Sequence, residues 1–155
     1  MTLDRFDRQL LNLVQDDSGQ TAERLAEQVG LSASAIQRRL KRLREEGVIA
    51  RDIAVVDPHK IGKAVFFVTS VTVERERPEV LAQLRAWIEA QPQIQQAFYV
   101  TGETDFILTV TTPDTETYEA LMARMLAENP QVSRFTTSVA LSVVKQGLKI
   151  PVPEE

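Results

Sequence analysis

The feature that most constrains the fold is a short helix, a tight turn and a basic helix within residues 21–46. Thr21 is a favourable N-cap residue, and Gly30 stands where a helix often ends in a left-handed residue. Ser32 then caps the second helix of the pair. The first helix spans only about eight residues, so it must pack against another element to be stable. This spacing is typical of a helix-turn-helix motif.

A third helix is expected at the N-terminus. Its apolar residues recur with the period of one helix face: Leu3, Phe6, Leu10, Leu13 and Val14. Turn-forming residues at 16–19 end the pattern. After the basic helix, apolar residues at 48–49 and 53–56 predict a short β-ribbon. We therefore expect a winged type of helix-turn-helix domain over residues 1–60.

Charge sets the basic helix apart from the rest of the chain. The whole sequence has a formal net charge of −4, which by itself argues against a nucleic-acid partner. Residues 32–44, however, carry five basic side chains and no acidic one. The local sign of the charge, rather than the total, decides where a polyanion docks. The alternative is a basic helix face that is only solvated, but its place after the turn favours double-stranded DNA.

Helix geometry assigns these residues to faces. At about 100° per residue, the apolar positions of the basic helix share one side: Ile36, Leu40 and Leu43. Residues turned away from that side are expected to reach base edges in a major groove: Gln37, Arg38 and Lys41. Arg42 and Arg44 are better placed for phosphates, which position a protein without specifying sequence. Arg39 lies nearer the apolar side, and we expect it to pair with an acid of the first helices as well as to contact phosphate. Three hydroxyl residues complete the candidate DNA-binding set: Thr21, Ser32 and Ser34.

The second half of the chain alternates strand and helix. Strands are predicted at residues 64–73, 93–101, 104–111 and 132–144. Helices are predicted to start at Pro78 and at Pro113, because proline is tolerated in the first turn. The order βαββαβ is the ferredoxin-like pattern. The sequence thus predicts an α+β chain in which a hinge at 61–63 joins the helix-turn-helix domain to a βαββαβ domain over residues 61–155.

The final predicted strand has two unlike faces. Larger apolar residues alternate with small or weakly polar ones: Phe135, Val139, Leu141 and Val143 against Thr136, Ser138, Ala140 and Ser142. One face can pack on the two helices. The other face would be bare in a four-stranded sheet with helices on one side only. A second subunit is the economical cover, so we expect a homodimer through this domain.

Several stretches of the sequence match a known family in the right order. They are LDRFDRQLLNLVQDDS (3–18), LAEQVGLSASAIQRRLKRLREEGVI (25–49), VDPHKIG (56–62), VTGETDFIL (100–108) and SVVKQGL (142–148). Over nearly its whole length the chain resembles the Lrp/AsnC, or feast/famine, transcription regulators. The resemblance implies a sequence-specific DNA-binding regulator of amino-acid metabolism genes that responds to an amino acid or related small metabolite. It also implies dimers that assemble into tetramers or octamers. Two helix-turn-helix units on a two-fold dimer predict a pseudo-palindromic operator.

The resemblance further implies an effector pocket at the hairpin around residue 102, where one dimer meets another. The implied effector-binding residues are Tyr99, Val100, Thr101, Gly102, Glu103, Thr104, Asp105, Thr136, Ser138 and Ala140. Gly102 lets the backbone approach a ligand with no Cβ in the way. Backbone N–H groups at 101–104 suit an α-carboxylate, and Asp105 suits an α-ammonium. A pocket wall that is partly from a neighbouring subunit is expected to consist of Tyr99, Thr136, Ser138 and Ala140. The alternative is that Gly102 only forms the turn and Asp105 only caps it.

Composition excludes several other chemistries. The chain has no cysteine, which removes disulfides, thiolate metal sites and cysteine nucleophiles. Its one histidine, His59, lies in an expected turn beside Pro58. We therefore expect no catalytic residue, no metal and no cofactor other than the small-molecule effector. No apolar run is long enough to cross a membrane and the N-terminus lacks a secretory pattern, so we expect a cytoplasmic protein.

Two alternatives to the regulator hypothesis remain open from the sequence. One is an enzyme like the siroheme decarboxylases, some of which share this architecture. A single histidine and an intact basic helix fit that alternative poorly. The other is an architectural DNA-binding protein without an effector, which only a ligand test separates from the regulator.

Overall fold

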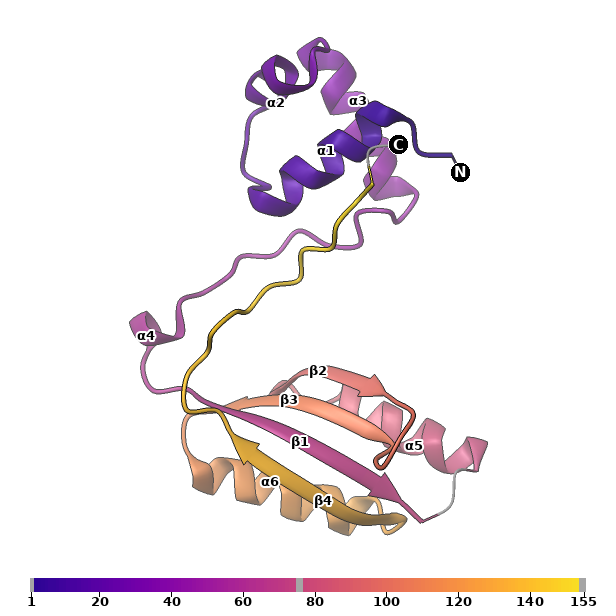
Figure 1. Ribbon diagram of the computed structural model, residues 1–155, viewed down its shortest axis with the longest axis vertical. Helices are drawn as coiled ribbons and strands as arrows, with labels where there is room; N and C mark the ends of the chain where they lie inside the picture. Colours follow the sequence, from indigo (N-terminus) through magenta and orange to yellow (C-terminus); the bar gives the residue numbers. More distant parts are fainter. Residues whose placement is uncertain (1, 75–76, 154–155) are drawn as a thin grey trace. The chain divides into compact units, whose positions relative to one another are not determined.

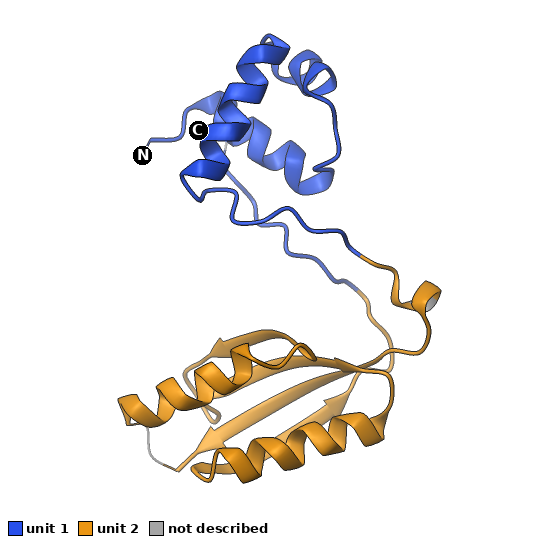
Figure 2. Ribbon diagram, turned by 180° about the vertical axis from the view of Figure 1, so that it is seen from behind, with its two compact units in different colours: residues 1–55, 145–155 blue, residues 56–144 orange. Residues whose placement is uncertain are grey.

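The computed structural model describes residues 2–74 and 77–153. The chain divides into two compact units (Figure 2): Met1–Val55 together with Lys145–Glu155, and Val56–Val144. The sequence had placed everything after the hinge in the second domain. In the structure, residues 145–153 are grouped with the helix-turn-helix unit by their contacts.

The first unit contains three helices (Figure 1): α1 Arg5–Asp16, α2 Ala22–Val29 and α3 Ala33–Glu45. Their starts are fixed by side-chain caps. Thr21 accepts a hydrogen bond from the N–H of Arg24, and Ser32 accepts one from Ala35. Gly30 adopts the left-handed conformation, with φ of 77°, at the end of α2. These capping residues and the three helices confirm the prediction from the sequence.

The three helices bury one small core. Its fully buried members come from all three helices: Leu10, Leu25, Val29, Ile36 and Leu40. Leu43 is also buried, so the apolar side predicted for α3 is its inner side. A single shared core of this kind holds short helices that would not persist alone. It therefore fixes α3 with its polar side outward.

The segment after α3 differs from the prediction. Residues 51–57 form neither helix nor strand, and Pro58–Ile61 forms the short helix α4. Ile53 and Val55 are exposed by 52% and 89% of their surface. A strand needs a neighbouring strand to satisfy its backbone groups, and no strand among the described residues pairs with this segment. The described residues therefore do not form the expected β-ribbon.

The second unit is a four-stranded antiparallel sheet in the order β2-β3-β1-β4. Its elements, in chain order, are β1 Val65–Val73, α5 Pro78–Glu89, β2 Ile94–Tyr99, β3 Phe106–Thr112, α6 Thr115–Glu128 and β4 Val132–Val139. The βαββαβ order and the α+β fold class are as predicted. Both helices cover the same face of the sheet, which Figure 2 shows from the helix side.

Alternation along the strands places the core under these helices. On β1, Phe67, Thr69 and Val71 point to the helices and are buried. The hydroxyl of Tyr118, from α6, lies 2.7 Å from Thr69 Oγ1 and 2.6 Å from Thr137 Oγ1. Thr69 and Thr137 are paired across β1 and β4, so these hydrogen bonds connect both strands to α6.

The other face of the sheet is not covered by any described element of its own unit. In one row across it lie Phe98, Ile107, Ser70 and Thr136. Phe98 and Val68 expose 54% and 45% of their surfaces there. Exposed apolar side chains gathered on one sheet face indicate an interaction surface. The bare face predicted from the sequence is therefore present.

The last strand is shorter than predicted. It ends at Val139, after which the N–H of Ala140 still donates to the carbonyl of Phe66. Its neighbour β1 begins at Val65, so no further backbone is available to pair. Leu141 is consequently fully exposed and does not pack on the helices, although its alternation predicted that it would.

Candidate functional site

The outward side of α3 carries the candidate DNA-binding residues. Those that are exposed are Ser32, Ser34, Gln37, Arg38, Lys41 and Arg44. Arg38 has no hydrogen bond or ion pair to any part of the chain that the structure describes. Lys41 is held only loosely, 3.7 Å from Glu45 and with both side chains in water. Arg38 and Lys41 are therefore free to reach a partner.

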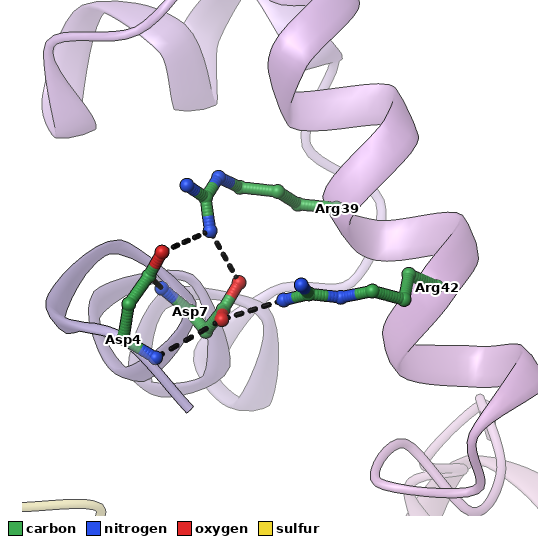
Figure 3. Close-up of polar contacts among 4 residues, drawn as sticks. All are labelled: Asp4, Asp7, Arg39 and Arg42. Atoms are coloured by element: carbon green, nitrogen blue, oxygen red, sulfur yellow. Dashed lines mark hydrogen bonds and ion pairs between the residues drawn. The ribbon is translucent and has the colours of Figure 1, made fainter. Parts of the chain in front are cut away.

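Two other arginines of α3 are anchored to α1 (Figure 3). Arg39 Nη1 donates 2.7 Å hydrogen bonds to Asp4 Oδ2 and Asp7 Oδ1. Arg42 Nη2 donates to Asp7 Oδ2 at 2.6 Å. Asp7 is fully buried and accepts a further bond from the N–H of Asp4. The expected pairing of Arg39 with an acid of the first helices is present, and Arg42 shares it.

The sequence reasoning did not single out Asp7, although a signal was available. On α1 it lies on the same turn as Phe6 and one turn before Leu10, beside the apolar stripe. An ionised side chain among core positions is rarely buried without a partner. The basic helix supplies that partner. Asp7 therefore positions α3 by its arginines rather than acting on a ligand.

Asp4 caps α1 and faces the same arginine. Its side chain accepts the N–H of Asp7, and the two residues form a reciprocal capping box. The Asp7 N–H and the Arg39 guanidinium together hold the pKa of the Asp4 carboxyl below its usual value of 3.8. Both interactions favour the ionised form, so this end of α1 stays anionic and bound to α3.

A cavity of about 220 Å³ opens beside this network. Its lining is Asp4, Arg38, Arg39 and Arg42. Three guanidinium groups against one carboxylate give the cavity a net positive lining. Guanidinium groups bind phosphate oxygens through paired N–H donors. The geometry therefore suits a backbone phosphate next to the residues that face a groove.

The remaining candidates at this site have structural partners. Thr21 and Ser32 cap α2 and α3, and Ser34 Oγ lies 3.2 Å from Ser32 Oγ. Arg44 Nε donates to Asp52 at 3.0 Å, with both side chains partly exposed. A capping hydroxyl still faces solvent and an exposed ion pair is weak. None of these contacts prevents a phosphate contact.

The second candidate site is the hairpin between β2 and β3. The N–H of Val100 donates to the carbonyl of Asp105, which closes the loop. Gly102 has φ of 125°, a backbone conformation that residues other than glycine rarely adopt. A Cβ added there would meet nothing within 4 Å. Thr101, Gly102 and Glu103 are exposed. The turn is thus open to a ligand and requires glycine for its backbone.

Asp105 and Thr104 tie the hairpin to β1. Asp105 Oδ2 accepts the N–H of Val73 at 2.7 Å, and Thr104 Oγ1 donates to the carbonyl of Val71 at 2.7 Å. Asp105 therefore caps the end of β1 rather than the hairpin turn, a contact that the sequence did not predict. This contact uses Oδ2, and Oδ1 has no hydrogen bond within the described residues.

The other expected pocket residues do not meet in one chain. Tyr99 lies on the helix side of the sheet, with its ring 5.1 Å from the guanidinium of Arg85. Thr136 and Ser138 lie on the open side, at the opposite edge. Two strands separate those edges, which at a strand spacing of about 4.8 Å is a wide gap. Ala140 follows Ser138 beyond the end of β4.

No helix among the described residues has the length and apolar character of a membrane span. Nor does that part of the chain bring together three or more His, Asp or Glu side chains as a metal would need.

Comparison with known families matches both units. Residues 3–50 match a winged helix-turn-helix DNA-binding domain. Residues 67–150 match the Lrp/AsnC ligand binding domain. The two matches together cover most of the chain, in the order that the structure shows.

Individual relatives match over almost the whole length. An uncharacterised HTH-type transcriptional regulator of Sinorhizobium fredii is 42% identical, over 98% of this chain and 90% of its own. The leucine-responsive regulatory protein of Salmonella typhimurium is 31% identical, over 97% and 92% respectively.

Solved structures agree with both the fold and the family. An AsnC family transcriptional regulator from Agrobacterium tumefaciens superposes with a TM-score of 0.88 at 30% identity, covering 96% of this chain and 97% of its own. A transcriptional regulator from Neisseria meningitidis, solved as a complex with L-Met, gives a TM-score of 0.86 at 26% identity, covering 97% of each chain. The chain, with its DNA-binding helices and its ligand-binding sheet, belongs to the Lrp/AsnC family of transcriptional regulators.

Proposed function

We propose that this regulator reads an operator through the outward side of α3 and that an amino acid or related small metabolite changes its DNA binding. The observation that carries the proposal is the division of labour among the arginines of α3. Arg39 and Arg42 are fixed by Asp7, while Arg38 is exposed and unpaired within the described residues. Two arginines orient the helix and a third is left to contact bases.

The contacts to DNA follow from this geometry. Gln37, Arg38 and Lys41 face base edges, because they lie on the exposed side of α3. Arg42 and Arg44 contact phosphates, and Arg39 contributes to the positive cavity beside them. Thr21, Ser32 and Ser34 supply hydroxyl donors at the helix starts. Helix N-termini favour phosphate as well.

The effector site is proposed at the hairpin, residues 99–105. Its free groups are the exposed backbone at 101–103 and the second oxygen of Asp105. A carboxylate and a row of backbone N–H groups complement the two charged ends of an amino acid. Two relatives support this class of ligand, since one is named leucine-responsive and another was solved with L-Met.

The pocket is completed by other subunits. Thr136, Ser138 and Ala140 lie far from the hairpin of their own chain, so they join such a pocket only through a neighbour. The open sheet face with Phe98 and Val68 supplies a surface for that assembly. We infer a homodimer that assembles to a tetramer or octamer, which couples effector binding to the spacing of DNA-binding units.

The proposed role is regulatory rather than catalytic. The relatives are named transcriptional regulators, and the site chemistry is that of binding. Named relatives are bacterial transcriptional regulators, which act on chromosomal DNA, so we propose a cytoplasmic location.

The decisive experiment is DNA binding by fluorescence anisotropy. The duplex from upstream of the protein's own gene is compared with a scrambled duplex across a salt series, with and without a mixture of amino acids. We expect tighter binding to the upstream duplex, a steep salt dependence and a shift caused by the mixture. Equal affinity for both duplexes at every salt concentration would contradict sequence-specific binding there. An unchanged curve with the mixture would contradict the effector.

A further inference from the structure

The outer face of α1 carries a row of polar side chains that neither the core nor α3 uses. The row consists of Arg8, Asn12, Gln15 and Asp16, which fall within an arc of about 100° on the helix. It lies opposite the side that holds Leu10 in the core. We call these four residues the docking face, because each of them contacts residues 149–153, called the C-terminal segment below.

Two carboxamides of the docking face each hold both backbone groups of one residue. Asn12 donates to the carbonyl of Val152 at 2.9 Å and accepts its N–H at 3.2 Å. Gln15 donates to the carbonyl of Ile150 at 3.0 Å and accepts its N–H at 2.9 Å. A carboxamide offers a donor and an acceptor side by side, as the edge of a strand does. The contact therefore recognises extended backbone rather than particular side chains.

Charged groups fix the direction of the segment at both ends. Arg8 Nη1 donates to the carbonyl of Pro153 at 3.1 Å. Lys149 Nζ lies 2.6 Å from both carboxylate oxygens of Asp16. The order 149, 150, 152, 153 thus meets 16, 15, 12, 8, so the segment runs antiparallel to α1. Contacts at four successive points give it a defined register.

The sequence of the segment suits this mode of binding. It reads Lys-Ile-Pro-Val-Pro, in which a proline follows each of the two residues that α1 holds by their N–H groups, Ile150 and Val152. Proline has no N–H, so positions 151 and 153 carry no backbone donor without a partner. Proline also fixes φ, which favours an extended segment before it docks. Preorganisation lowers the entropy lost on binding.

The position of Asp16 supports a specific role. Asp16 is the last residue of α1, and no basic residue lies in that last turn. An acid at a helix C-terminus interacts unfavourably with the helix dipole. Its pairing with Lys149 offsets this unfavourable interaction.

We infer that the docking face of α1 is a strand-binding site whose occupant is the C-terminal segment of the same chain, and that this docking restrains the helix-turn-helix unit. Chain connectivity gives the reason. The unit is joined to the sheet unit once through residues 50–64, and docking adds a second connection through residues 140–148. Two connections leave a DNA-binding unit less freedom than one, which lowers the entropy lost when several units bind one operator. The effect on DNA rests on the proposed function above; the docking does not.

The first test is amide hydrogen exchange in the full chain. The variant Asn12→Leu with Gln15→Met removes both carboxamides without changing the charge, and leucine and methionine are good helix formers. We expect the amides of Ile150 and Val152 to be protected in the wild type and to exchange at least tenfold faster in the variant. Gln20→Met, in the same unit but away from the segment, is the matched control. Equal exchange of these amides in wild type and variant would overturn the docking.

A second test uses the absence of native cysteine. Asn12→Cys with Val152→Cys places two thiols at one contact, and Gln20→Cys with Val152→Cys is the control. We expect oxidation to form a bond within one chain in the first pair only. A covalent dimer would assign the segment to the docking face of a second copy and would overturn the same-chain inference. A bond that forms as readily in the control pair would overturn it as well.

The third test measures DNA affinity by anisotropy. We expect Asn12→Leu with Gln15→Met to weaken operator binding by about threefold to tenfold, while Gln20→Met leaves it unchanged. The oligomeric mass of each variant is checked by light scattering, so that a lost assembly is not mistaken for a lost restraint. Unaltered affinity with lost amide protection would overturn the restraint. Failure of the wild type to bind any duplex would contradict the proposed function alone, because the exchange and cross-linking results do not depend on DNA.

Discussion

Arg42 on the basic helix α3 donates a 2.6 Å hydrogen bond to Asp7, a fully buried residue of α1. The same carboxylate accepts from Arg39 through its other oxygen. A basic patch that looks uniform in the sequence is therefore divided in space. Part of it holds α3 against α1, and part of it is available to a polyanion. This division makes separate predictions for stability and for DNA binding.

The first prediction concerns Asp7→Asn. The neutral amide keeps the shape but removes the charge that two guanidinium groups share in a buried position. We expect a loss of about 2–3 kcal/mol in the stability of the helix-turn-helix unit, because hydrogen bonds to charged groups contribute that much and the arginines are only partly able to rehydrate.

The two units can be followed separately in the same sample. The single tryptophan, Trp87, packs in the sheet unit, so its fluorescence reports on that unit. Urea unfolding followed by far-UV circular dichroism includes the helices of the first unit. We expect Asp7→Asn to shift the helical transition and to leave the Trp87 transition in place. A shift of both would show that Asp7 does not act locally.

The second prediction concerns acid. The pKa of Asp4 is lowered by the Asp7 N–H and then by Arg39, so the ionised form stabilises the folded state. This contribution is complete above the ordinary value of 3.8 and is lost as the pH falls through the lower folded value. Asp4→Asn keeps an equally good N-cap but has no charge to lose.

The measurement is urea unfolding of wild type and Asp4→Asn between neutral pH and about pH 2. We expect the wild type to be more stable at neutral pH by less than about 1 kcal/mol, since Asp4 is half exposed. The two curves should converge in acid. A difference that stays constant across this range would contradict a role for the Asp4 charge.

The third prediction separates base contact from phosphate contact. Arg38→Ala should weaken operator binding by about 1–3 kcal/mol and relax the preference at one base pair, if Arg38 reads a guanine. Lys41→Ala tests the neighbouring position on the same face. If Lys41 contacts bases, this variant also changes the base preference. If Lys41 contacts phosphate, the variant binds all duplexes more weakly, and the slope of log affinity against log salt concentration falls by about one.

Selection of binding sites from a random pool measures both effects. The control is Arg5→Ala, which removes an exposed arginine of α1 from the same unit. An unchanged site preference in Arg38→Ala would refute its assignment to a base.

The helices and strands were predictable where one local signal decided them. Thr21, Gly30 and Ser32 begin or end helices through their own backbone and side-chain chemistry. The β-ribbon around Ile53 and the extension of β4 to residue 144 failed for a shared reason. Both segments have apolar alternation, but a strand also needs a neighbour with unpaired backbone, and alternation in one segment does not reveal it.

The candidate sites show the same limit. Arg39 was expected to pair internally because it lies near the apolar side of its helix. Arg42 was not, because its place on the helix wheel assigned it to phosphate contact, yet it also reaches Asp7. The docking of residues 149–153 on α1 was also hidden, because carboxamides that hold a backbone leave no pattern in hydrophobicity or charge.

The fourth prediction concerns the buried hydroxyl chain of the sheet unit. Tyr118→Phe keeps the ring, which stacks on Phe67, but removes the group between Thr69 and Thr137. Thr69 is fully buried and would lose its partner, so we expect a loss of about 1–2 kcal/mol, seen in the Trp87 transition. Replacing all three hydroxyls, with Thr69→Val and Thr137→Val added, should recover much of the loss. No recovery would show that shape, rather than hydrogen bonding, is decisive.

The last prediction distinguishes the two roles of Asp105. Its Oδ2 caps the N–H of Val73, and its Oδ1 is proposed to hold the ammonium of the effector. Asp105→Asn retains an oxygen for Val73 but loses the negative charge, whereas Asp105→Ala loses both. We expect Asp105→Asn to keep the wild-type stability and DNA affinity. Its affinity for the effector should fall roughly tenfold to a hundredfold, the value of one charge-assisted hydrogen bond.

Titration calorimetry checks this with the amino acid that gives the largest heat with wild type among the proteinogenic set. Asp105→Ala should show the same loss of affinity and also a lower unfolding midpoint, because the end of β1 is then uncapped. Gln96→Leu, on the open face of β2, is the control for a change in the sheet away from the hairpin. Full effector affinity in Asp105→Asn would leave Asp105 with its structural role only, and the ammonium would then have to be bound by a group from another subunit.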